Sequence, residues 1–170
     1  MTLRSTTKRW LLTVIGAATT ALITPSVSSA ATSPADDPFY QYTGSTPLAN
    51  IAPGTVLNTR TINYQILGIS IGLKATQLLY RSTDAQLRPA VNVTTVIKPK
   101  CLICPNKNKV ISYQSFYDSL NPADQPSWAL SGGKSFTDLI PGIETALFVP
   151  FLLKGYTIVI PDTQGQKANF

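Results

Sequence analysis

The most informative absence in this 170-residue sequence is histidine, of which there is none. A serine hydrolase with a Ser-His-Asp triad needs an imidazole to take the proton from its serine, so these residues alone cannot form one. Cysteine is scarce too, with two residues, and a zinc site would have to recruit carboxylates to complete its ligands. We therefore expect neither a complete triad nor a metal site within this sequence.

Long hydrophobic runs are also missing. The longest mostly apolar stretch, residues 10–23, is shorter than the ~20 residues that a membrane-spanning helix needs. It follows three basic residues and precedes the small residues Ser28 and Ala30, an arrangement typical of a secretory signal peptide. We expect residues 1–30 to be removed and the mature protein to be secreted, without a stable membrane span. A retained N-terminal anchor is the alternative.

Charged residues give no sign of a nucleic-acid surface. The sequence has 14 basic and 8 acidic residues, a net charge of +6. Three of the basic residues lie in the signal peptide, which leaves 11 against 8, or +3, for the rest. Because no basic run is interleaved with aromatic residues, we do not expect the protein to bind nucleic acid.

Cys101 and Cys104 form a lone C-x-x-C pattern in the stretch KPKCLICPNKNK. The same pattern occurs in thioredoxin-like redox sites and in half of a zinc site, but each needs further elements that we do not find here. In an oxidising compartment, the pattern predicts a small disulfide loop between two strands. A redox protein built on this pair remains a distant alternative.

Residues 31–54 are rich in proline, alanine, serine and threonine and lack a sustained period, so we expect an extended N-terminal arm. Its aromatic residues are expected to pack the arm onto the body. From residue 55 onward, runs rich in Val, Ile, Thr and Tyr predict strands. These runs are Thr55–Leu67, Leu73–Thr83, Ala90–Lys98 and Lys109–Phe116, with residues 84–89 as a hairpin connection.

The C-terminal third has a different pattern. Residues 121–135, with closely spaced prolines and glycines, predict a long surface loop. Helical spacing follows from Gly142 to Leu153, interrupted by Pro150. Residues 156–162 form a nearly continuous apolar run, typical of a strand buried in a parallel sheet. Strand, helix and buried strand begin a βαβ unit, so we expect an α/β fold in which antiparallel strands lead into a parallel pair.

The stretch GISIG, residues 68–72, fits the G-x-S-x-G pattern of a nucleophilic serine on a strand-to-helix turn. However, the residues that follow alternate as a strand would, and a sharp turn between two antiparallel strands also needs glycine. A Ser-Lys pair with Lys74 is possible in principle, but nothing in the sequence indicates the burial that would activate the lysine. We therefore do not expect Ser70 to be a nucleophile.

Several longer segments carry a resemblance to a known family. They are LKATQLLYRSTDAQLRPAVNVTTVIKP, ISYQSFYDSLNPADQPSWAL and LLKGYTIVIPDTQGQKANF, preceded by the arm DPFYQYTGSTPLANIAPGTVLNTR. Together they resemble the secretory lipase family, the lipase-A type of α/β-hydrolase. The resemblance covers essentially all of the mature chain, in order.

This resemblance implies a secreted serine hydrolase that acts on triacylglycerols and other carboxylic esters, at a lipid–water interface and without a metal or organic cofactor. In the family, the nucleophile elbow, the triad acid and the triad histidine all follow the strand that is similar to residues 157–162. The resemblance thus implies that residues 55–170 are the N-terminal part of a hydrolase domain, which explains the missing histidine. We expect the 170-residue chain to be inactive alone.

The resemblance also implies roles for individual residues. Tyr117 and Asp118 match a Tyr-Asp pair whose aspartate helps to form the oxyanion hole; from the residues alone, Asp118 would instead cap a turn. Trp128 and Phe136 would lie near the acyl pocket, although packing explains each equally well.

A complete, non-catalytic, secreted β-rich binding module is the alternative to a lipase fragment. It accounts for the strands and the signal peptide, but it explains the βαβ start near the C-terminus poorly.

Overall fold

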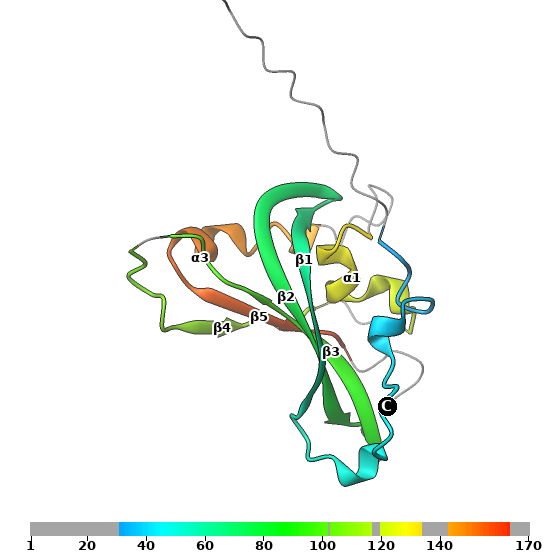
Figure 1. Cartoon of the computed structure of the whole chain (residues 1–170). Coiled ribbons are helices and arrows are strands. Elements are labelled where there is room, and N and C mark those ends of the chain that lie inside the picture. Colours follow the sequence, from blue (N-terminus) through cyan, green and yellow to red (C-terminus); the bar gives the residue numbers. More distant parts are fainter. Residues whose placement is uncertain (1–30, 102, 117–119, 134–142, 164–170) are drawn as a thin grey trace, which may run out of the picture.

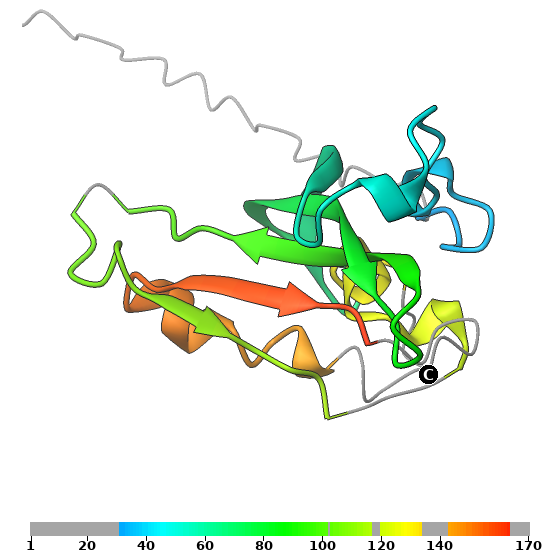
Figure 2. The ribbon, with the colours of Figure 1, turned by 90° about the horizontal axis from the view of Figure 1, so that it is seen from below.

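The computed structural model describes residues 31–101, 103–116, 120–133 and 143–163. Their centre is a five-stranded sheet with the strand order β1-β2-β3-β5-β4 (Figures 1 and 2). The strands are β1 (Val56–Ile66), β2 (Ile69–Thr83), β3 (Pro89–Ile97), β4 (Val110–Ser112) and β5 (Thr157–Pro161). The helical segments are short: η1 (Pro38–Tyr40), η2 (Leu48–Asn50), η3 (Pro122–Asp124), α1 (Pro126–Leu130) and α3 (Val149–Leu153).

The sheet is mixed, with a single parallel pair among the described strands. β1, β2, β3 and β5 pair antiparallel in that order, whereas β4 pairs parallel to β5, with Ile111 opposite Ile158. A parallel pair needs a crossover, and the chain between β4 and β5 carries α1 and α3. Figure 2 shows β5 between β3 and β4. The prediction that antiparallel strands lead into a parallel pair is confirmed.

The core lies on one face of the sheet. Side chains of β2 alternate, so that Ala75 and Leu79 are buried while Lys74 and Thr76 are exposed. The same face of the neighbouring strands presents Ile97. Leu130 from α1 and Leu152 from α3 complete this core, together with Tyr64, Phe148, Ile158 and Ile160. The two helices therefore cover a single face in the described part of the chain.

A smaller cluster attaches the N-terminal arm to the sheet. Phe39 and Tyr40 of η1 are buried against Leu79 and Val93. The expectation that aromatic residues pack the arm onto the body is confirmed for these two.

The prediction of a surface loop over residues 121–135 is wrong for its described part. This segment forms η3 and then α1, in which Ala129 and Leu130 are almost fully buried. Pro126 starts α1, because proline is tolerated in the first helical turn. The prediction relied on the proline and glycine content of the segment. The burial of Ala129 and Leu130 in the core stabilises a helix there in spite of this composition.

The bounds of several elements also differ from the prediction. β2 begins at Ile69 and not at Leu73, because Leu67 and Gly68, both with positive φ, already make the turn from β1. β4 is only three residues long. Pro150 is the second residue of α3 and lies in its first turn, so it does not interrupt a longer helix.

The β2–β3 connection is a hairpin, as predicted for residues 84–89. Asp84 organises it: its carboxylate accepts the backbone N–H groups of Gln86 and Arg88, at 2.9 and 2.8 Å. Leu87 has φ of 62° and its side chain is 85% exposed. A leucine in the left-handed region has a steric clash at its Cβ atom that glycine avoids. Because the Leu87 side chain is mostly exposed, its packing contributes little stability to offset this clash.

We predict that Leu87→Gly stabilises the protein by about 1 kcal/mol, which raises the melting temperature by a few degrees. Thermal unfolding followed by circular dichroism measures this. Leu87→Ala is the control, because alanine keeps the Cβ atom that causes the clash and should leave stability nearly unchanged. A loss of stability in Leu87→Gly would contradict the assignment of strain to this residue.

Candidate functional site

The carboxyl ends of β4 and β5 lie at the same edge of the sheet, because the two strands are parallel. In open α/β sheets, ligands bind beyond the carboxyl ends of the strands. A functional site is therefore expected at the segments that leave these two ends. Each leads to a buried carboxylate, Glu144 near β4 and Asp162 after β5.

Glu144 holds the segment that leaves β4. Its Oε1 accepts the Tyr113 hydroxyl at 3.0 Å and the Phe116 backbone N–H at 3.3 Å, and its Oε2 accepts the Ser115 hydroxyl at 2.8 Å. Three hydrogen bonds to one carboxylate fix the course of residues 113–116. The side chain of Phe116 is 73% exposed at the end of this segment.

Tyr113 also helps to hold the segment that leaves β4. Its ring packs edge-to-face on Phe148, with centroids 4.8 Å apart. Burial, and then the hydrogen bond and charge of Glu144, raise the pKa of the Tyr113 hydroxyl to about 12. Tyr113 therefore stays a neutral donor to Glu144 at physiological pH, and not a proton-transfer group.

Three predicted site residues lie outside the described residues. Tyr117 and Asp118 follow Phe116 directly, and Phe136 belongs to the stretch 134–142. The oxyanion role of Asp118 and the acyl-pocket role of Phe136 accordingly stay predictions.

Asp162 follows β5 and is almost fully buried. Its two carboxylate oxygens accept both donors of Ser127, the backbone N–H at 2.8 Å and the hydroxyl at 2.6 Å. Its backbone N–H donates to the Val93 carbonyl, and its carbonyl accepts the Asn92 side chain, each at 2.9 Å. Asp162 thus joins β5, β3 and α1 at one point.

The pKa of Asp162 is raised from 3.8 to about 7. Burial is the main cause, because it penalises the charged carboxylate. The hydrogen bonds from Ser127 and the charge of Arg60 oppose this shift without cancelling it. Near neutral pH, Asp162 is therefore close to the midpoint of its titration.

The polar cluster extends from Asp162 to the N-terminal arm. Tyr40 lies with its hydroxyl 2.9 Å from the Ser127 hydroxyl, and the Gln77 side chain donates to the Ser127 carbonyl at 2.7 Å. Arg60 donates to Gln77 at 2.7 Å, pairs with Asp37, and lies over the rings of Phe39 and Tyr40. Because each member bonds to the next, the cluster is a structural network more than an open reaction site.

Trp128 has a structural contact of its own. Its indole N–H donates to the backbone carbonyl of Thr32 in the arm at 3.1 Å. The backbone of Gly133 lies directly against its ring, where an added Cβ would clash with it. These contacts show how Trp128 is held, and its predicted role beside an acyl pocket stays a prediction.

Ser70 lies within β2, exposed, and pairs with Gln65 of β1. No helix leaves the GISIG stretch, so it is not a strand-to-helix elbow. Lys74 is exposed as well, and its ammonium group donates to Asn63 at 2.5 Å. The hairpin therefore has neither the strand-to-helix turn nor the buried lysine that a Ser-Lys nucleophile would require.

Cys101 and Cys104 are joined by a disulfide in the loop between β3 and β4, with Cα atoms 5.7 Å apart. Within the described ranges, no cluster of His, Cys, Asp or Glu is suited to hold a metal ion. In the same part of the chain, no helix is long and apolar enough to cross a membrane.

Sequence reasoning missed the two buried carboxylates. A signal for Asp162 existed, because an acidic residue directly after a buried apolar strand often lies at a functional edge. Glu144 had a weaker signal, a lone acid within an otherwise apolar helical pattern. Ser127 has no such signal, because the composition of residues 121–135 predicts a surface loop.

No protein-family model matches this chain. Lipase 4 of Candida albicans is 37% identical over 142 residues, which cover 82% of this chain and 30% of that protein. A probable inactive lipase of Mycobacterium tuberculosis is 34% identical over 135 residues, and a secreted triacylglycerol lipase of Malassezia furfur 32% over 140; they cover 79% and 81% of this chain, and 30% and 29% of those proteins.

Among solved structures, Candida antarctica lipase A in its closed state matches with a TM-score of 0.65 and 28% identity, over 82% of this chain and 32% of that one. The matching region is the N-terminal portion of that enzyme. This chain is a partial homologue of the lipase-A-type lipases. It spans about 30% of the length of the curated relatives that it matches.

We predict that the buried carboxylate makes the lipase homologue less stable as pH rises. The pKa of Asp162 is higher in the folded protein than its ordinary value of 3.8, so the favourable contribution of the protonated form is complete below pH 3.8 and is lost by about pH 7. Asp162→Asn keeps an acceptor for the Ser127 N–H and does not titrate. It should abolish a decline that amounts to up to roughly 4 kcal/mol.

The measurement is the free energy of unfolding by urea at pH 5 and pH 8. Asp36→Asn is the matched control, because Asp36 is exposed and should leave the pH dependence unchanged. Equal pH dependence in the wild type and in Asp162→Asn would show that this carboxylate does not titrate in the expected range.

Proposed function

We propose that this chain is part of a secreted lipase or esterase that hydrolyses triacylglycerols or other carboxylic esters. The observation that carries the proposal is the homology to lipases over about four fifths of the chain, joined to a structural match to lipase A with a TM-score of 0.65. Secretion rests on the predicted signal peptide, residues 1–30, and on a secreted relative. The substrate is a lipid or ester, reached at a lipid–water interface.

In this proposal the chain supplies the N-terminal scaffold of an α/β-hydrolase, with residues 31–54 as an arm and 55–170 as the start of the catalytic domain. The serine nucleophile, the triad acid and the histidine follow residue 170. With no histidine in its sequence, the 170-residue chain does not turn over by itself. No metal or organic cofactor takes part.

Asp118 contributes to the oxyanion hole, with Tyr117 supporting it. In α/β-hydrolases, the loop after the strand numbered third in that fold commonly gives one oxyanion donor. We assign this place to the loop after β4, because Asp118 follows β4 and the segment that Glu144 fixes. A donor placed near the developing oxyanion lowers the barrier by ~3 kcal/mol. Asp118 can donate through its backbone N–H, or through its carboxyl group when that is protonated.

A second candidate is a non-catalytic, secreted, β-rich binding module. One relative, named as a probable inactive lipase, favours it. In this case the core and the polar cluster are retained for binding alone, and no hydrolysis follows.

The test is hydrolysis of tributyrin and of p-nitrophenyl butyrate by the secreted product of the whole reading frame. Asp118→Ala should lower kcat about 100-fold with little change in KM, as the loss of a side chain that stabilises only the transition state does. Ser70→Ala is the matched control and should keep full activity.

Three outcomes would contradict the proposal in different ways. Absence of hydrolysis by the wild type favours the binding module. Loss of activity in Ser70→Ala makes GISIG the nucleophile motif after all. Full activity in Asp118→Ala removes the side chain of Asp118 from the oxyanion hole, while leaving its backbone N–H as a donor.

A further inference from the structure

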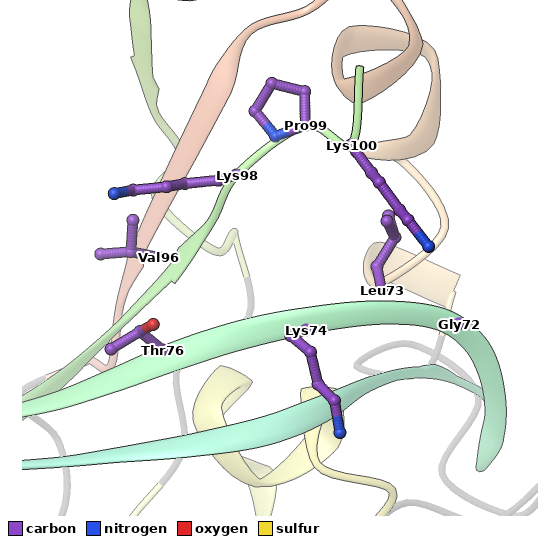
Figure 3. Close-up of a pocket in the computed structure, with 8 residues that line it drawn as sticks. All are labelled: Gly72, Leu73, Lys74, Thr76, Val96, Lys98, Pro99 and Lys100. Atoms are coloured by element: carbon purple, nitrogen blue, oxygen red, sulfur yellow. The ribbon is translucent and has the colours of Figure 1, made fainter. Parts of the chain in front are cut away.

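A groove with a volume of about 370 Å³ opens where β3 separates from β2 (Figure 3). Its walls include the apolar side chains of Leu73, Val96 and Pro99. Three lysines line it as well, Lys74 from β2 and Lys98 and Lys100 from the segment that follows β3. Binding sites for small amphiphilic molecules commonly combine an apolar wall with a few polar or charged groups.

The sequence explains why a groove forms here. Pairing between β2 and β3 ends at Ala75 and Ile97, and Pro99 has no N–H with which to continue it. β2 runs on beyond this point to pair with β1, and Gly72 takes a positive φ of 75° within it. The two strands therefore diverge, and the space between them stays open.

The charge of the groove is one-sided. The two salt bridges found in the described part of the chain are Arg60–Asp37 and Arg88–Asp84, so none of the three lysines has a carboxylate partner there. Lys98 and Lys100 are exposed, and Figure 3 shows their side chains diverging, with Lys100 reaching toward Leu73 and Lys74 pointing away from β3. Their aliphatic stems border the apolar wall while the ammonium groups reach solvent.

We propose that this groove binds a fatty-acid anion, with its alkyl chain along Leu73, Val96 and Pro99 and its carboxylate at Lys100, whose side chain reaches toward Leu73 (Figure 3). An ammonium group and a carboxylate make a charge-assisted hydrogen bond, and the apolar wall removes several methylene groups from water. The groove lacks aromatic side chains for stacking, which disfavours a nucleotide. Ile97 pairs with Ile158, so the groove lies toward the amino end of β5, opposite to Asp162.

The inference does not rest on the proposed hydrolase activity, because binding can be measured on the secreted product of the whole reading frame whether or not that product hydrolyses esters. Isothermal titration of this purified protein with decanoate, below its micelle concentration, should give a Kd on the order of 0.1–1 mM. Uncharged 1-decanol should bind about tenfold more weakly. The amide resonances of Thr76 and Val96 should shift on titration with decanoate.

The decisive variants remove charge and keep the side-chain stems. Lys98→Gln with Lys100→Gln should weaken decanoate binding about tenfold or more. Lys107→Gln with Lys109→Gln is the matched control, because it removes the same charge from exposed lysines that do not line the groove. Val96→Thr keeps the size of the side chain, adds a hydroxyl to the apolar wall, and should weaken binding severalfold.

Two results would overturn the inference. Equal weakening by both lysine pairs would show a general attraction to a basic protein and not a site. Binding to vesicles of anionic phosphatidylglycerol without binding to decanoate would show a surface for anionic membranes. Because both lysine pairs are exposed, the variants should unfold at the wild-type temperature, which separates loss of the site from loss of the fold.

Discussion

The buried carboxylate of Asp162 is the constraint on which the arrangement of this chain depends. It sits directly after β5 and binds both donors of Ser127, and thereby fixes α1 at the carboxyl end of the sheet. Tyr40 and Gln77 meet the same serine, so the N-terminal arm and β2 are joined to this point as well. A buried ionisable group is costly unless its partners satisfy it, and here the partners come from two elements, Ser127 from α1 and Asn92 and Val93 from β3.

Glu144 plays a comparable part at the end of β4. Its three hydrogen bonds direct residues 113–116 out of the sheet, next to β5 and toward the edge where parallel strands present ligands. The two carboxylates thus shape the segments that leave the only parallel pair among the described strands. In the proposed hydrolase, the acyl group binds at this edge. An oxyanion donor must be held in place before the reaction, and the hydrogen bonds of the two carboxylates hold the segments that leave β4 and β5.

Much of the fold was predictable from the sequence. The β-branched runs predicted four strands, and the apolar run at residues 156–162 correctly indicated the fifth, which has a parallel partner. The prediction for residues 121–135 was wrong because local composition does not reveal that Leu130 packs into a core formed by residues distant in sequence. The hydrogen bonds between Ser127 and Asp162 could not be predicted for the same reason, because the two residues are 35 positions apart in the sequence. That a strand and not a helix follows GISIG was predictable, because it depends only on the local alternation of residues.

The central claim, that this chain is the front portion of a lipase-A-type hydrolase, is tested most directly by sequencing the coding DNA beyond codon 170. The account predicts an open frame that continues into a strand ending in G-x-S-x-G, followed by an acidic residue and a histidine in that order. A stop codon directly after codon 170, or a continuation that encodes no histidine, would contradict it.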